Sequence, residues 1–452
     1  MSLALILLAA GKGTRMESDL PKVLHRLAQA PLLWHALRAG QALEPARSVV
    51  VAGHGAEAVE ASTADFAPEA QVVIQQEQLG TAHAVAQARP ALEGFEGDAL
   101  VLYGDTPFIT EATLEAMREA RAKHDVVVLG FEAAEPGRYG RLVTEGDALQ
   151  RIVEFKDASE TERAITLCNS GVVCADSKTL FDLIDAVGND NASGEYYLTD
   201  IVEIARSRGL SAGVVRCDEA ETLGINSRAE LRAAEAAFQA RKRAELLDEG
   251  VLMSAPETVF FAWDTYVGRD AEIEPNVVFG PGVTVETGAR IRAFSHLEGC
   301  HVSRGAIVGP YARLRPGAEL AEEVHVGNFV EVKNAYLAEG VKANHLTYIG
   351  DADIGERTNI GAGTITCNYD GFFKHRTTIG KNAFIGSDTM LVAPVTVGDG
   401  AMTGSGSVVT EDVPAGALAL GRTKQVTKPG FATRLRDMLK AKKAAQQTAK
   451  GD

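Results

Sequence analysis

The sequence predicts two domains of different fold class, an α/β domain followed by an all-β domain built as a parallel β-helix. The chain has 452 residues, which is more than one hydrophobic core usually serves. Strand-like apolar runs alternate with helical stretches over residues 1–226, and an apolar residue then recurs at intervals of six residues, with one slip and one break, within residues 251–425. Residues 227–250 are expected to form a linker helix, and residues 426–452 form a tail.

Five apolar runs are the strand candidates of the first domain. Their alternation with helical stretches is typical of an α/β domain with a largely parallel sheet. The first run is too short for a membrane span and has no basic segment before it, so we expect a buried strand and no membrane insertion. The five runs are Leu3–Leu8, Ser48–Ala52, Gln71–Ile74, Ala99–Tyr103 and Val126–Phe131.

The linker helix and the tail are distinguished by composition. Residues 227–250 have helical apolar spacing, with Ser227 at the N-cap position and Gly250 beyond the carboxyl end. The tail from Phe431 to Asp452 is rich in Arg, Lys, Ala and Gln. Its composition favours a solvated helix that frays at its end, while a segment that binds RNA or a protein partner is the alternative.

A six-residue apolar repeat defines the second domain. Seventeen of eighteen repeat positions are apolar, and glycine often follows, as in Val267-Gly268. In a parallel β-helix each side of a triangular coil takes one hexapeptide, whose apolar residue points inward. The repeat positions are Val267, Ile273, Phe279, Val285, Ile291 and Leu297, then Val302, Val308, Leu314, Leu320, Val326 and Val332, and after a break Ile379, Ile385, Leu391, Val397, Thr403 and Val409.

The composition excludes some classes of function. A net charge of −16 argues against a nucleic-acid partner for the body of the protein, because phosphate backbones would be repelled. The cysteines are odd in number and show no Cys-x-x-Cys spacing, which favours reduced thiols in a cytoplasmic protein over disulfides or a zinc site. They are Cys168, Cys174, Cys217, Cys300 and Cys367.

A glycine-rich turn follows the first strand, in the run Leu8-Ala9-Ala10-Gly11-Lys12-Gly13-Thr14-Arg15-Met16. It matches neither a Walker A loop nor the dinucleotide fingerprint, which need other spacings. Small residues let backbone N–H groups approach a phosphate closely, and Arg15 and Lys22 add positive charge. A purely structural turn is an equally good interpretation of this segment alone.

An acidic residue follows the fourth strand candidate, where Tyr103 leads through Gly104 into Asp105. Ligands of open α/β sheets bind at the carboxyl ends of strands, so Asp105 should face the same crevice as the glycine-rich turn. A carboxylate beside a triphosphate requires a hard cation, and Mg²⁺ binds proteins through few ligands. An aspartate that merely caps a helix or a turn is the alternative.

Together these segments resemble the nucleoside-diphosphate-sugar pyrophosphorylases. The signature Leu-x-x-Gly-x-Gly-Thr-Arg-Met/Leu with a later Pro-Lys is matched through Met16, Pro21 and Lys22. The resemblance implies a Rossmann-like nucleotidyltransferase domain that transfers uridylyl from UTP to a sugar 1-phosphate, with Arg15 and Lys22 neutralising charge. It implies that Asp105 and Asn226 bind Mg²⁺.

The same resemblance implies a binding site for UTP and the UDP-sugar. Gln75 and Gln78 correspond to the uracil-reading segment, while Tyr139-Gly140-Arg141 and Gly194–Thr199 correspond to sugar-binding positions. The implied site residues are Leu8, Ala9, Ala10, Gly11, Gly13, Arg15, Lys22, Gln75, Gln78, Gly80, Thr81, Tyr103, Gly104, Asp105, Gly140, Glu154, Asn169, Thr199 and Asn226.

The repeat also places side chains along the β-helix. Residues eighteen apart in an unbroken run stack on adjacent coils, about 4.8 Å apart. Arg315 and Lys333 are so spaced, and we infer a phosphate site there because two unmatched cations would repel each other. Ser387 and Ser405 are also eighteen apart, and they form either a surface on which a long ligand lies or a hydroxyl ladder without a ligand.

The longest interruption of the repeat, between Val332 and Ile379, contains a candidate base. His345 lies there near Tyr348, and departures from local regularity tend to mark function. A neutral imidazole suits the deprotonation of an ammonium nucleophile near neutral pH. A lone histidine with a structural role is the alternative.

These segments resemble the hexapeptide acyltransferases, which are left-handed β-helices that usually trimerise. The runs 313–320, 325–333, 344–348 and 359–371 further resemble the bifunctional family that joins N-acetylglucosamine-1-phosphate uridyltransferase and glucosamine-1-phosphate acetyltransferase activities. This resemblance covers nearly the whole chain, with both domains in order, and it implies a homotrimer formed through the β-helix.

By this resemblance His345 is the general base that frees the amine of glucosamine 1-phosphate to attack acetyl-CoA. The implied glucosamine-phosphate residues are Arg315, Lys333, Tyr348, Asn359 and Lys374. The implied acetyl-CoA residues are Asn368, Tyr369, Ser387, Ser405 and Arg422, of which Ser405 stands where the family is expected to have alanine.

The sequence therefore predicts a cytoplasmic bifunctional enzyme that acetylates glucosamine 1-phosphate and couples the product to UTP. UDP-N-acetylglucosamine and pyrophosphate would result, and the former would supply envelope polymers. Two alternatives stay open: a pyrophosphorylase whose β-helix only trimerises it, and a non-catalytic scaffold or nucleotide sensor. Retention of Asp105 and His345 disfavours the scaffold.

Overall fold

A computed structural model describes residues 2–146 and 148–448 of the chain. It divides into two compact units. The first comprises Met1–Asp248 with Phe260–Thr265, and the second comprises Glu249–Val259 with Tyr266–Asp452.

The first unit is built on a mixed sheet with the strand order β11-β7-β10-β6-β1-β4-β5. All five expected strands are present, as β1 (Leu3–Ala9), β4 (Arg47–Ala52), β5 (Gln71–Ile74), β6 (Asp98–Tyr103) and β7 (Val126–Glu132). The contacts β1 to β4, β4 to β5 and β1 to β6 are parallel, as expected. The further strands are β2 (Arg26–Leu27), β3 (Ala30–Pro31), β8 (Arg141–Glu145), β9 (Ala148–Val153), β10 (Leu167–Asp176) and β11 (Ala212–Cys217).

One strand makes the sheet mixed. β10 is antiparallel to both β6 and β7, and its register with β7 shifts between Asn169 and Val173. The short strands β8 and β9 pair as an antiparallel hairpin beside β10. The sequence did not predict β8 to β11.

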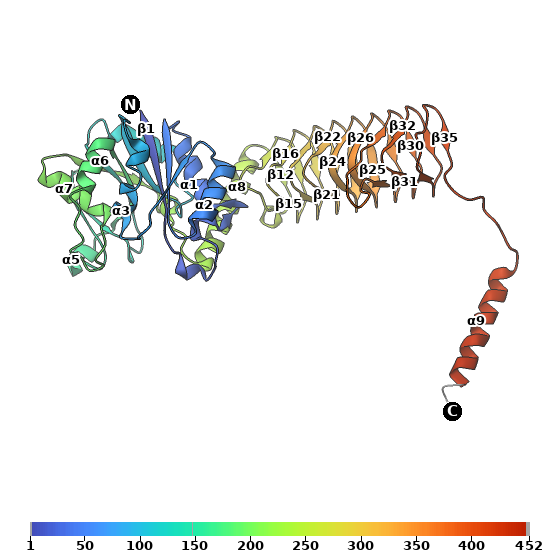
Figure 1. Cartoon of the computed structure of the whole chain (residues 1–452), viewed down its shortest axis with the longest axis horizontal. Helices are drawn as coiled ribbons and strands as arrows, with labels where there is room; N and C mark the ends of the chain where they lie inside the picture. Colours follow the sequence, from blue (N-terminus) through green and yellow to red (C-terminus); the bar gives the residue numbers. More distant parts are fainter. Residues whose placement is uncertain (1, 147, 449–452) are drawn as a thin grey trace. The chain divides into compact units, whose positions relative to one another are not determined.

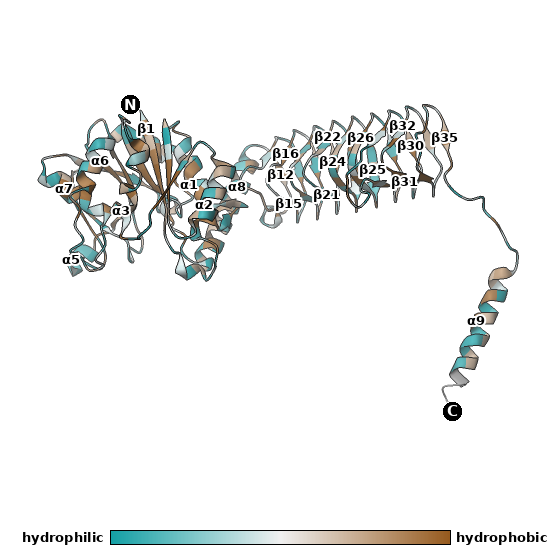
Figure 2. Ribbon diagram, viewed as in Figure 1, coloured by the Kyte–Doolittle hydropathy of each residue, from teal (hydrophilic) through white to brown (hydrophobic). Residues whose placement is uncertain are grey.

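Helices cover both faces of this sheet because its strands are buried on both sides. Alternate residues of β1 face two separate cores, with Leu5 and Leu7 in one and Ile6 and Leu8 in the other. Figure 2 shows these strands as predominantly hydrophobic. The first core also holds side chains of α1 (Leu32–Gln41), α2 (Ala56–Phe66) and α4 (Glu111–Ala120), and the second holds side chains of α3 (Thr81–Ala86), α6 (Ser177–Ile184) and α7 (Ile201–Ser207). A short helix, α5, spans Glu160–Arg163.

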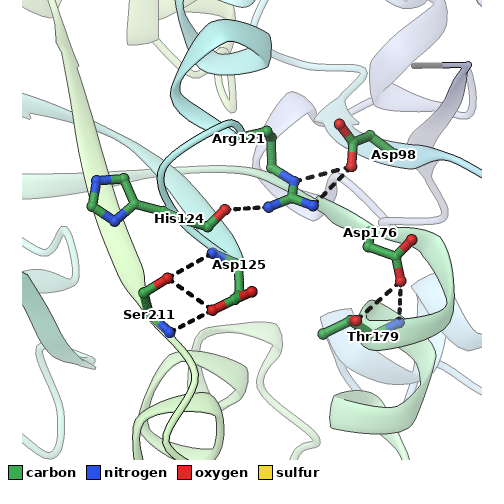
Figure 3. Close-up of polar contacts among 7 residues, drawn as sticks. All are labelled: Asp98, Arg121, His124, Asp125, Asp176, Thr179 and Ser211. Atoms are coloured by element: carbon green, nitrogen blue, oxygen red, sulfur yellow. Dashed lines mark hydrogen bonds and ion pairs between the residues drawn. The ribbon is translucent and has the colours of Figure 1, made fainter.

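A network of polar contacts lies at the amino ends of the strands (Figure 3). Arg121 donates from Nε and Nη2 to the Asp98 carboxylate at 3.1 and 2.9 Å, and from Nη1 to the carbonyl of His124. Both side chains of this ion pair are less than a tenth exposed. Nearby, Asp125 accepts hydrogen bonds from the amide and hydroxyl of Ser211. Backbone and side-chain donors thus satisfy the carboxylates at this edge of the sheet.

The expected linker helix is observed as α8 (Arg228–Asp248), but it packs within the first unit. Its side chains Ala234 and Phe238 enter a small core with Leu27, Leu32 and Phe108 of the same unit. Gln239 is buried and exchanges two hydrogen bonds with the backbone of Phe261, at 2.7 and 2.9 Å. The first compact unit therefore includes this helix and extends to Asp248.

The second unit is a parallel β-helix whose coils stack one on the next (Figure 1). All eighteen repeat positions predicted to point inward are at most 5% exposed, including the one threonine. One sheet contains β12 (Leu252–Met253), β14 (Glu272–Ile273), β17 (Arg290–Ile291), β20 (Ile307–Val308), β23 (His325–Asn328), β25 (Lys342–His345), β27 (Asn359–Ile360), β30 (Phe384–Ile385), β33 (Met402–Thr403) and β35 (Leu418–Ala419).

Two long strands join the other two sides of the β-helix into one connected sheet. These strands, β24 (Glu331–Leu337) and β26 (Tyr348–Ile354), turn a corner of the coil. The remaining strands of that sheet are β13 (Tyr266–Val267), β15 (Val278–Phe279), β16 (Thr284–Val285), β18 (His296–Leu297), β19 (Cys300–Val302), β21 (Arg313–Leu314), β22 (Ala318–Leu320), β28 (Ile365–Cys367), β29 (Thr377–Ile379), β31 (Met390–Val392), β32 (Val395–Val397) and β34 (Val408–Val409).

The break in the repeat is a change of coil length. Glu331 pairs with Tyr348 and Tyr348 pairs with Ile365, so these coils have 17 residues. Ile365 then pairs with Met390, so the next coil has 25 residues. The six-residue repeat is therefore interrupted between Val332 and Ile379, as predicted, but the coils continue through the interruption and the extra residues form a hairpin over residues 368–375.

The tail contains a helix, α9 (Phe431–Thr448), whose side chains up to residue 446 are exposed. This agrees with the interpretation as a solvated helix, and its fraying end lies outside the described residues. Within residues 2–146 and 148–448, no helix has the length and apolar character needed to cross a membrane. All five cysteines are free thiols, as expected.

Candidate active sites

A cavity of about 320 Å³ opens at the carboxyl ends of β1, β5 and β6 in the first unit. The glycine-rich turn forms one part of its wall, and the segment after β5 forms another. Its lining residues are Leu8, Ala9, Ala10, Gly11, Lys22, Val23, Gln75, Gln78, Gly80, Thr81, Ala84, Tyr103, Asp105 and Glu195. Eleven of them are residues that the sequence placed in the UTP site, so the prediction of one shared crevice at this edge agrees with the structure.

A second cavity, of about 550 Å³, shares Tyr103 and Asp105 with the first. Arg15 and Asn226 line it, so the structure brings both into the neighbourhood of Asp105. Its other lining residues are Thr106, Arg138, Tyr139, Ser170, Thr222, Gly224 and Glu230. Most of these were not predicted from the sequence.

Lys22 connects the two predicted metal ligands. Its Nζ donates a hydrogen bond to Asp105 Oδ2 and another, of 2.8 Å, to Asn226 Oδ1. Lys22 and Asp105 are both less than a fifth exposed. Three segments that are distant in sequence therefore place a carboxylate oxygen and an amide oxygen around one positive charge.

The oxygens of Asp105 and Asn226 fit a magnesium ion. Carboxylate and amide oxygens are hard ligands, and they already converge on a cation, the Lys22 ammonium. In the described part of the chain, no group of three or more His, Cys, Asp and Glu side chains lies together around a possible metal position. A metal at this pair would therefore have few protein ligands, as Mg²⁺ beside phosphates usually does.

A glycine allows Lys22 to reach this position. Gly13 has φ of +60°, and a Cβ there would lie 2.5 Å from Cβ of Lys22. Any larger residue would push Lys22 away from the turn. A second glycine, Gly104, connects two strands at this edge of the sheet. Its N–H donates to the carbonyl of Leu8 at 2.9 Å and so joins the end of β6 to the end of β1.

The predicted uracil-reading segment is held by its own hydrogen bonds. The Gln75 amide nitrogen donates to Gly80 O at 3.2 Å and lies 2.9 Å from His83 Nδ1, while Gln75 itself is 3% exposed. Thr81 Oγ1 accepts from the amide of Leu198 at 2.9 Å. The Gln75 NH₂ group is therefore engaged within the protein, which leaves its carbonyl oxygen as the group suited to read a base.

The residues predicted to bind the sugar lie around Glu154. Thr199 Oγ1 donates to Glu154 Oε1 at 3.3 Å, and a Cβ on Gly140 would lie 3.4 Å from that oxygen and 3.6 Å from Cβ of Asn169. Burial raises the pKa of Glu154 above its ordinary value. Glu154 lines a third cavity, of about 270 Å³, with Arg138, Phe155, Lys156, Ser193 and Tyr197.

Several predicted residues do not line these cavities, and some were missed. Gly13, Gly104, Gly140, Asn169 and Thr199 are absent from the three sets of lining residues. Arg141, placed at the sugar by resemblance, is 1% exposed and donates to the carbonyls of Tyr139 and Gly137. The cavities also include Arg138, which was not predicted and lies two residues from Gly140, and Glu195, which belongs to the run Gly194–Thr199 that the resemblance placed at the sugar.

In the β-helix, Arg315 and Lys333 follow paired residues on adjacent coils, as their spacing predicted. However, Arg315 Nη1 donates to Glu331 Oε1 at 2.9 Å, and this carboxylate also lies 3.7 Å from Arg313. The premise of two unmatched cations is therefore wrong for Arg315. A phosphate site there now depends on the resemblance, with Glu331 as an additional neighbour.

His345 is exposed and ends β25. Its Nδ1 lies 3.0 Å from Oδ1 of Asn328, its register partner on the preceding coil. Because this oxygen can only accept, the tautomer of the neutral ring that satisfies the contact has its proton on Nδ1 and its lone pair on Nε2. In that tautomer Nε2 is the nitrogen able to act as a base.

The inserted hairpin carries several of the other predicted residues. Tyr369 and Lys374 form an antiparallel bridge, and Lys374 Nζ lies 4.5 Å from the centre of the Tyr369 ring. Asn368, the first residue of the hairpin, is buried. Asn359 lies on β27, the strand that precedes β28 in the same coil. Since Asn359 pairs with Phe384, these residues, placed by resemblance at the sugar and at acetyl-CoA, lie on one coil.

Ser387 and Ser405 stack on adjacent coils as predicted, because Phe384 pairs with Met402 and Met390 pairs with Val408. Both serines are exposed, and the Gly406 N–H donates to the carbonyl of Ser387 at 2.8 Å. Arg422 is exposed and follows the last strand, β35.

Comparison with known proteins decides the family. Residues 5–198 match the MobA-like NTP transferase domain, and residues 376–411 match six repeats of the bacterial transferase hexapeptide. The chain is 69% identical to the bifunctional protein GlmU of Jannaschia sp. (strain CCS1), with 98% of each chain covered. It is 70% identical to that of Ruegeria sp. (strain TM1040), with all of each chain covered, and 67% identical to that of Paracoccus denitrificans (strain Pd 1222), with 97% of this chain and 98% of the relative covered.

The chain belongs to the GlmU family of bifunctional proteins. Its first unit is a Rossmann-like nucleotidyltransferase domain with a mixed sheet, and its second is the left-handed β-helix of the hexapeptide transferases. The predicted fold classes and the prediction of a bifunctional transferase are confirmed at this level. The roles of individual residues stay predictions.

Proposed function

We propose that the β-helix acetylates glucosamine 1-phosphate with acetyl-CoA and that the first unit couples the product to UTP, giving UDP-N-acetylglucosamine and pyrophosphate. The observation that carries the proposal is the meeting of Lys22, Asp105 and Asn226 at the wall shared by two cavities. Membership of the GlmU family supports the pairing of the two reactions. The product would serve as a precursor of the cell envelope.

In the first unit the chemistry is nucleotidyl transfer. A phosphate oxygen of the sugar 1-phosphate attacks the α-phosphorus of UTP, the bond from that phosphorus to the bridging oxygen breaks, and pyrophosphate leaves. The attacking oxygen is already anionic, so no strong base is needed. Backbone N–H groups of the glycine-rich turn would bind phosphate oxygens, and Arg15 would stabilise the developing charge.

Asp105 and Asn226 would hold Mg²⁺, which neutralises phosphate charge when it is bound. Lys22 would then turn from this pair, because two cations cannot share the same oxygens at contact distance. Its ammonium would remain beside the cavity that Gly11 and Lys22 line and would contact the pyrophosphate. Lys22 therefore has two roles, first as a counter-ion for Asp105 and then as a phosphate ligand.

In the β-helix the chemistry is acyl transfer to an amine. His345 Nε2 would take a proton from the ammonium of glucosamine 1-phosphate, and the amine would attack the thioester carbonyl of acetyl-CoA. The carbon–sulfur bond breaks, the second proton of the attacking amine passes to the departing sulfur, and coenzyme A leaves as a thiol. Asn328 would hold the imidazole in the reactive tautomer throughout.

A homotrimer formed through the β-helix is part of the proposal. The hexapeptide repeats support it, and so does an exposed column of aromatic side chains at one corner. Phe294 stacks on Tyr311 with ring centres 4.9 Å apart, and Tyr311 stacks on Phe329 at 5.4 Å. Each is about half exposed, which is costly for three adjacent rings on a free surface. Light scattering should give three times the mass of the chain, and a monomer would contradict the trimer.

A cytoplasmic location also belongs to the proposal. The five free thiols support it, because an oxidising compartment would favour disulfides. UTP and acetyl-CoA as co-substrates are consistent with it.

One coupled assay tests the function. Purified protein receives glucosamine 1-phosphate, acetyl-CoA, UTP and Mg²⁺, and thiol and pyrophosphate are followed separately. We expect both, and we expect His345→Ala to abolish thiol release while it leaves pyrophosphate formation from supplied N-acetylglucosamine 1-phosphate unchanged. If the unaltered protein forms pyrophosphate but releases no thiol, it is a pyrophosphorylase with a single activity. If it forms neither product, the scaffold is favoured.

A further inference from the structure

Three polar side chains on consecutive coils form a column beside the inserted hairpin. Asn334, Asp351 and Asn368 are separated by 17 residues each, which is the length of the coils in this region. Asp351 is 9% exposed and Asn368 is 5% exposed. Asp351 lies in the middle of β26 at a left-handed φ of +48°, where this strand turns the corner.

The carboxylate of Asp351 bridges the two amides. Asn334 Nδ2 donates to Oδ1 of Asp351, and Asn368 Nδ2 donates to Oδ2. A buried carboxylate is tolerated when each oxygen accepts a hydrogen bond. Asparagine at this position would offer only one oxygen, so one neighbouring amide would have to turn and accept a hydrogen bond instead of donating one. Aspartate is therefore the residue that accepts from both amides in the orientation they have here.

This column leads to Tyr348, which is one of the predicted sugar-site residues. Asn368 Nδ2 also donates to the Tyr348 hydroxyl, at 3.4 Å. Gly350 leaves room for this contact, because a Cβ there would lie 2.3 Å from the Tyr348 hydroxyl and 2.7 Å from Asn368 Nδ2. The orientation of Tyr348 and that of Asn368 are thus coupled.

The column also ends at the base of the hairpin. The Asn368 carbonyl accepts the amide of His375 at 2.9 Å, so the hairpin over residues 368–375 is closed at Asn368. Tyr369 and Lys374, which the sequence placed at acetyl-CoA and at the sugar, lie just inside this closure. A displacement of Asn368 would therefore move both.

We propose that Asp351 is a positioning residue for acetyl transfer, which fixes Asn368, Tyr348 and the base of the hairpin. Asp351 does this from beneath the surface, through its hydrogen bond to Asn368. The proposal rests on the proposed acetyltransferase function of the β-helix for its effect on rate, but the anchoring of the hairpin is independent of that function.

The variant Asp351→Asn tests the effect on rate in the full chain. We expect kcat/KM for thiol release to fall about 10- to 100-fold, the usual effect of losing a residue that orients a ligand-contacting group, with pyrophosphate formation unchanged. Asp270→Asn is the matched control, since Asp270 is also at a left-handed corner of a coil, with φ of +59°, but is exposed. An unchanged kcat/KM in Asp351→Asn would overturn the positioning role.

A double-mutant cycle separates positioning from general stability. If Asp351 acts through Asn368, the combination of Asp351→Asn with Asn368→Ala should lower the rate no more than Asn368→Ala alone. Multiplication of the two single effects would overturn the proposed route, because independent damage to the fold adds in free energy.

Chymotrypsin tests the anchor without any assay of catalysis. Phe372 and Phe373 at the hairpin tip are 88% and 70% exposed, so cleavage there reports opening of the hairpin. We expect cleavage at least about tenfold faster in Asp351→Asn than in the unaltered protein and in Asp270→Asn. Equal rates would overturn the anchoring. If the unaltered protein released no thiol, the proposed function would fail, and this cleavage would still decide the role of Asp351 as the anchor.

Discussion

β6 carries a paired carboxylate near each of its ends, and the two pairs differ in how their cation is held. At the amino end, Asp98 is paired with Arg121, whose three nitrogens donate to Asp98 and to the His124 carbonyl (Figure 3). Beyond the carboxyl end, Asp105 shares Lys22 with Asn226 beside two cavities. The first cation is fixed by a rigid fork, and the second is a single ammonium on a flexible chain.

This difference shows why burial of an ion pair is weak evidence for function. The pair of Asp98 and Arg121 is the more buried of the two. It lies at the amino edge of the sheet, where none of the predicted site residues lies. The pair of Asp105 and Lys22 has a second oxygen ligand and an adjoining cavity, so its cation is able to exchange. The position at the carboxyl edge of the sheet, and not the ion pair itself, indicates the active site.

The largest effect on stability is expected from Arg121→Met. It leaves Asp98 buried without a partner, which should lower the free energy of unfolding of the first unit by about 3–5 kcal/mol. Urea unfolding measures this change. Arg118→Met, in the last turn of the helix α4 that Arg121 follows, is the control, since its ion pair with Glu115 is exposed and should contribute under about 1 kcal/mol. Equal losses in the two variants would contradict a structural role specific to Asp98 and Arg121.

The next effect is on catalysis, in Asp105→Asn. Pyrophosphate formation should fall about 100-fold or more, because a charge that acts on the transition state is lost. The urea midpoint should change much less than in Arg121→Met, since Lys22 keeps Asn226 as a partner. Thiol release in the same preparation is the internal control. If Asp105→Asn lost much stability and little of its rate of pyrophosphate formation, the carboxyl end of β6 would be the structural end, contrary to this assignment.

A smaller effect is expected where α4 begins, because this helix connects the carboxyl edge to the amino edge of the sheet. Thr110 caps α4 by accepting from the amide of Thr113 at 3.3 Å, and its hydroxyl donates to Glu221 at 2.9 Å. Thr110→Ala should cost about 1 kcal/mol in the free energy of unfolding. Thr110→Ser retains both contacts of the hydroxyl. If it lowered the free energy of unfolding as much as Thr110→Ala does, the loss of the cap would not be the cause.

The smallest expected effects are changes in stability with pH, and these have opposite signs for Asp125 at the amino edge of the sheet and Glu154 near the carboxyl edge. Hydrogen bonds from Ser211 lower the pKa of Asp125 at the amino edge, so its contribution to stability is present above the unfolded pKa of about 3.9 and is lost as pH falls through the folded value. Asp125→Asn should therefore be less stable than the unaltered protein at pH 7, and this deficit should shrink in acid. Urea midpoints over a range of pH measure it.

Glu154, which lines the third cavity, should give the opposite dependence of stability on pH. Burial raises its pKa, so the ionised carboxylate costs stability at neutral pH, and this cost disappears as pH falls below the unfolded pKa of about 4.3. Glu154→Gln should be more stable than the unaltered protein at pH 7 and should lose this advantage in acid. A constant difference between the two at every pH would show that titration of Glu154 is not responsible.

The sequence predicted those parts of the fold that depend on a regular side-chain period. The strands β1, β4, β5, β6 and β7 and all eighteen inward positions of the β-helix follow from apolar spacing. β10 was not predicted, because a register shift between Asn169 and Val173 interrupts its pattern. The sequence predicted the interruption between Val332 and Ile379 but not the coils that continue through it, because these have 17 or 25 residues, which a search for a strict six-residue period misses.

The candidate sites were predicted only as far as the backbone determines them. The end of β6 brings Asp105 to the glycine-rich turn, as the topology of such sheets requires. The placement of Lys22 between Asp105 and Asn226 depends on the path of a long side chain, which no spacing describes. Likewise, Glu331 meets Arg315 although it is the register partner of Arg313, so a count of eighteen residues could not find it.

The stacking of coils in the β-helix has a mechanical consequence. Its strands run around each coil, and the hydrogen bonds between paired strands join one coil to the next. Tension applied along the stack therefore acts on all hydrogen bonds of one coil boundary together, and on successive boundaries in series. Such an array yields at its weakest boundary, while tension applied across the coils would instead act on covalent backbone.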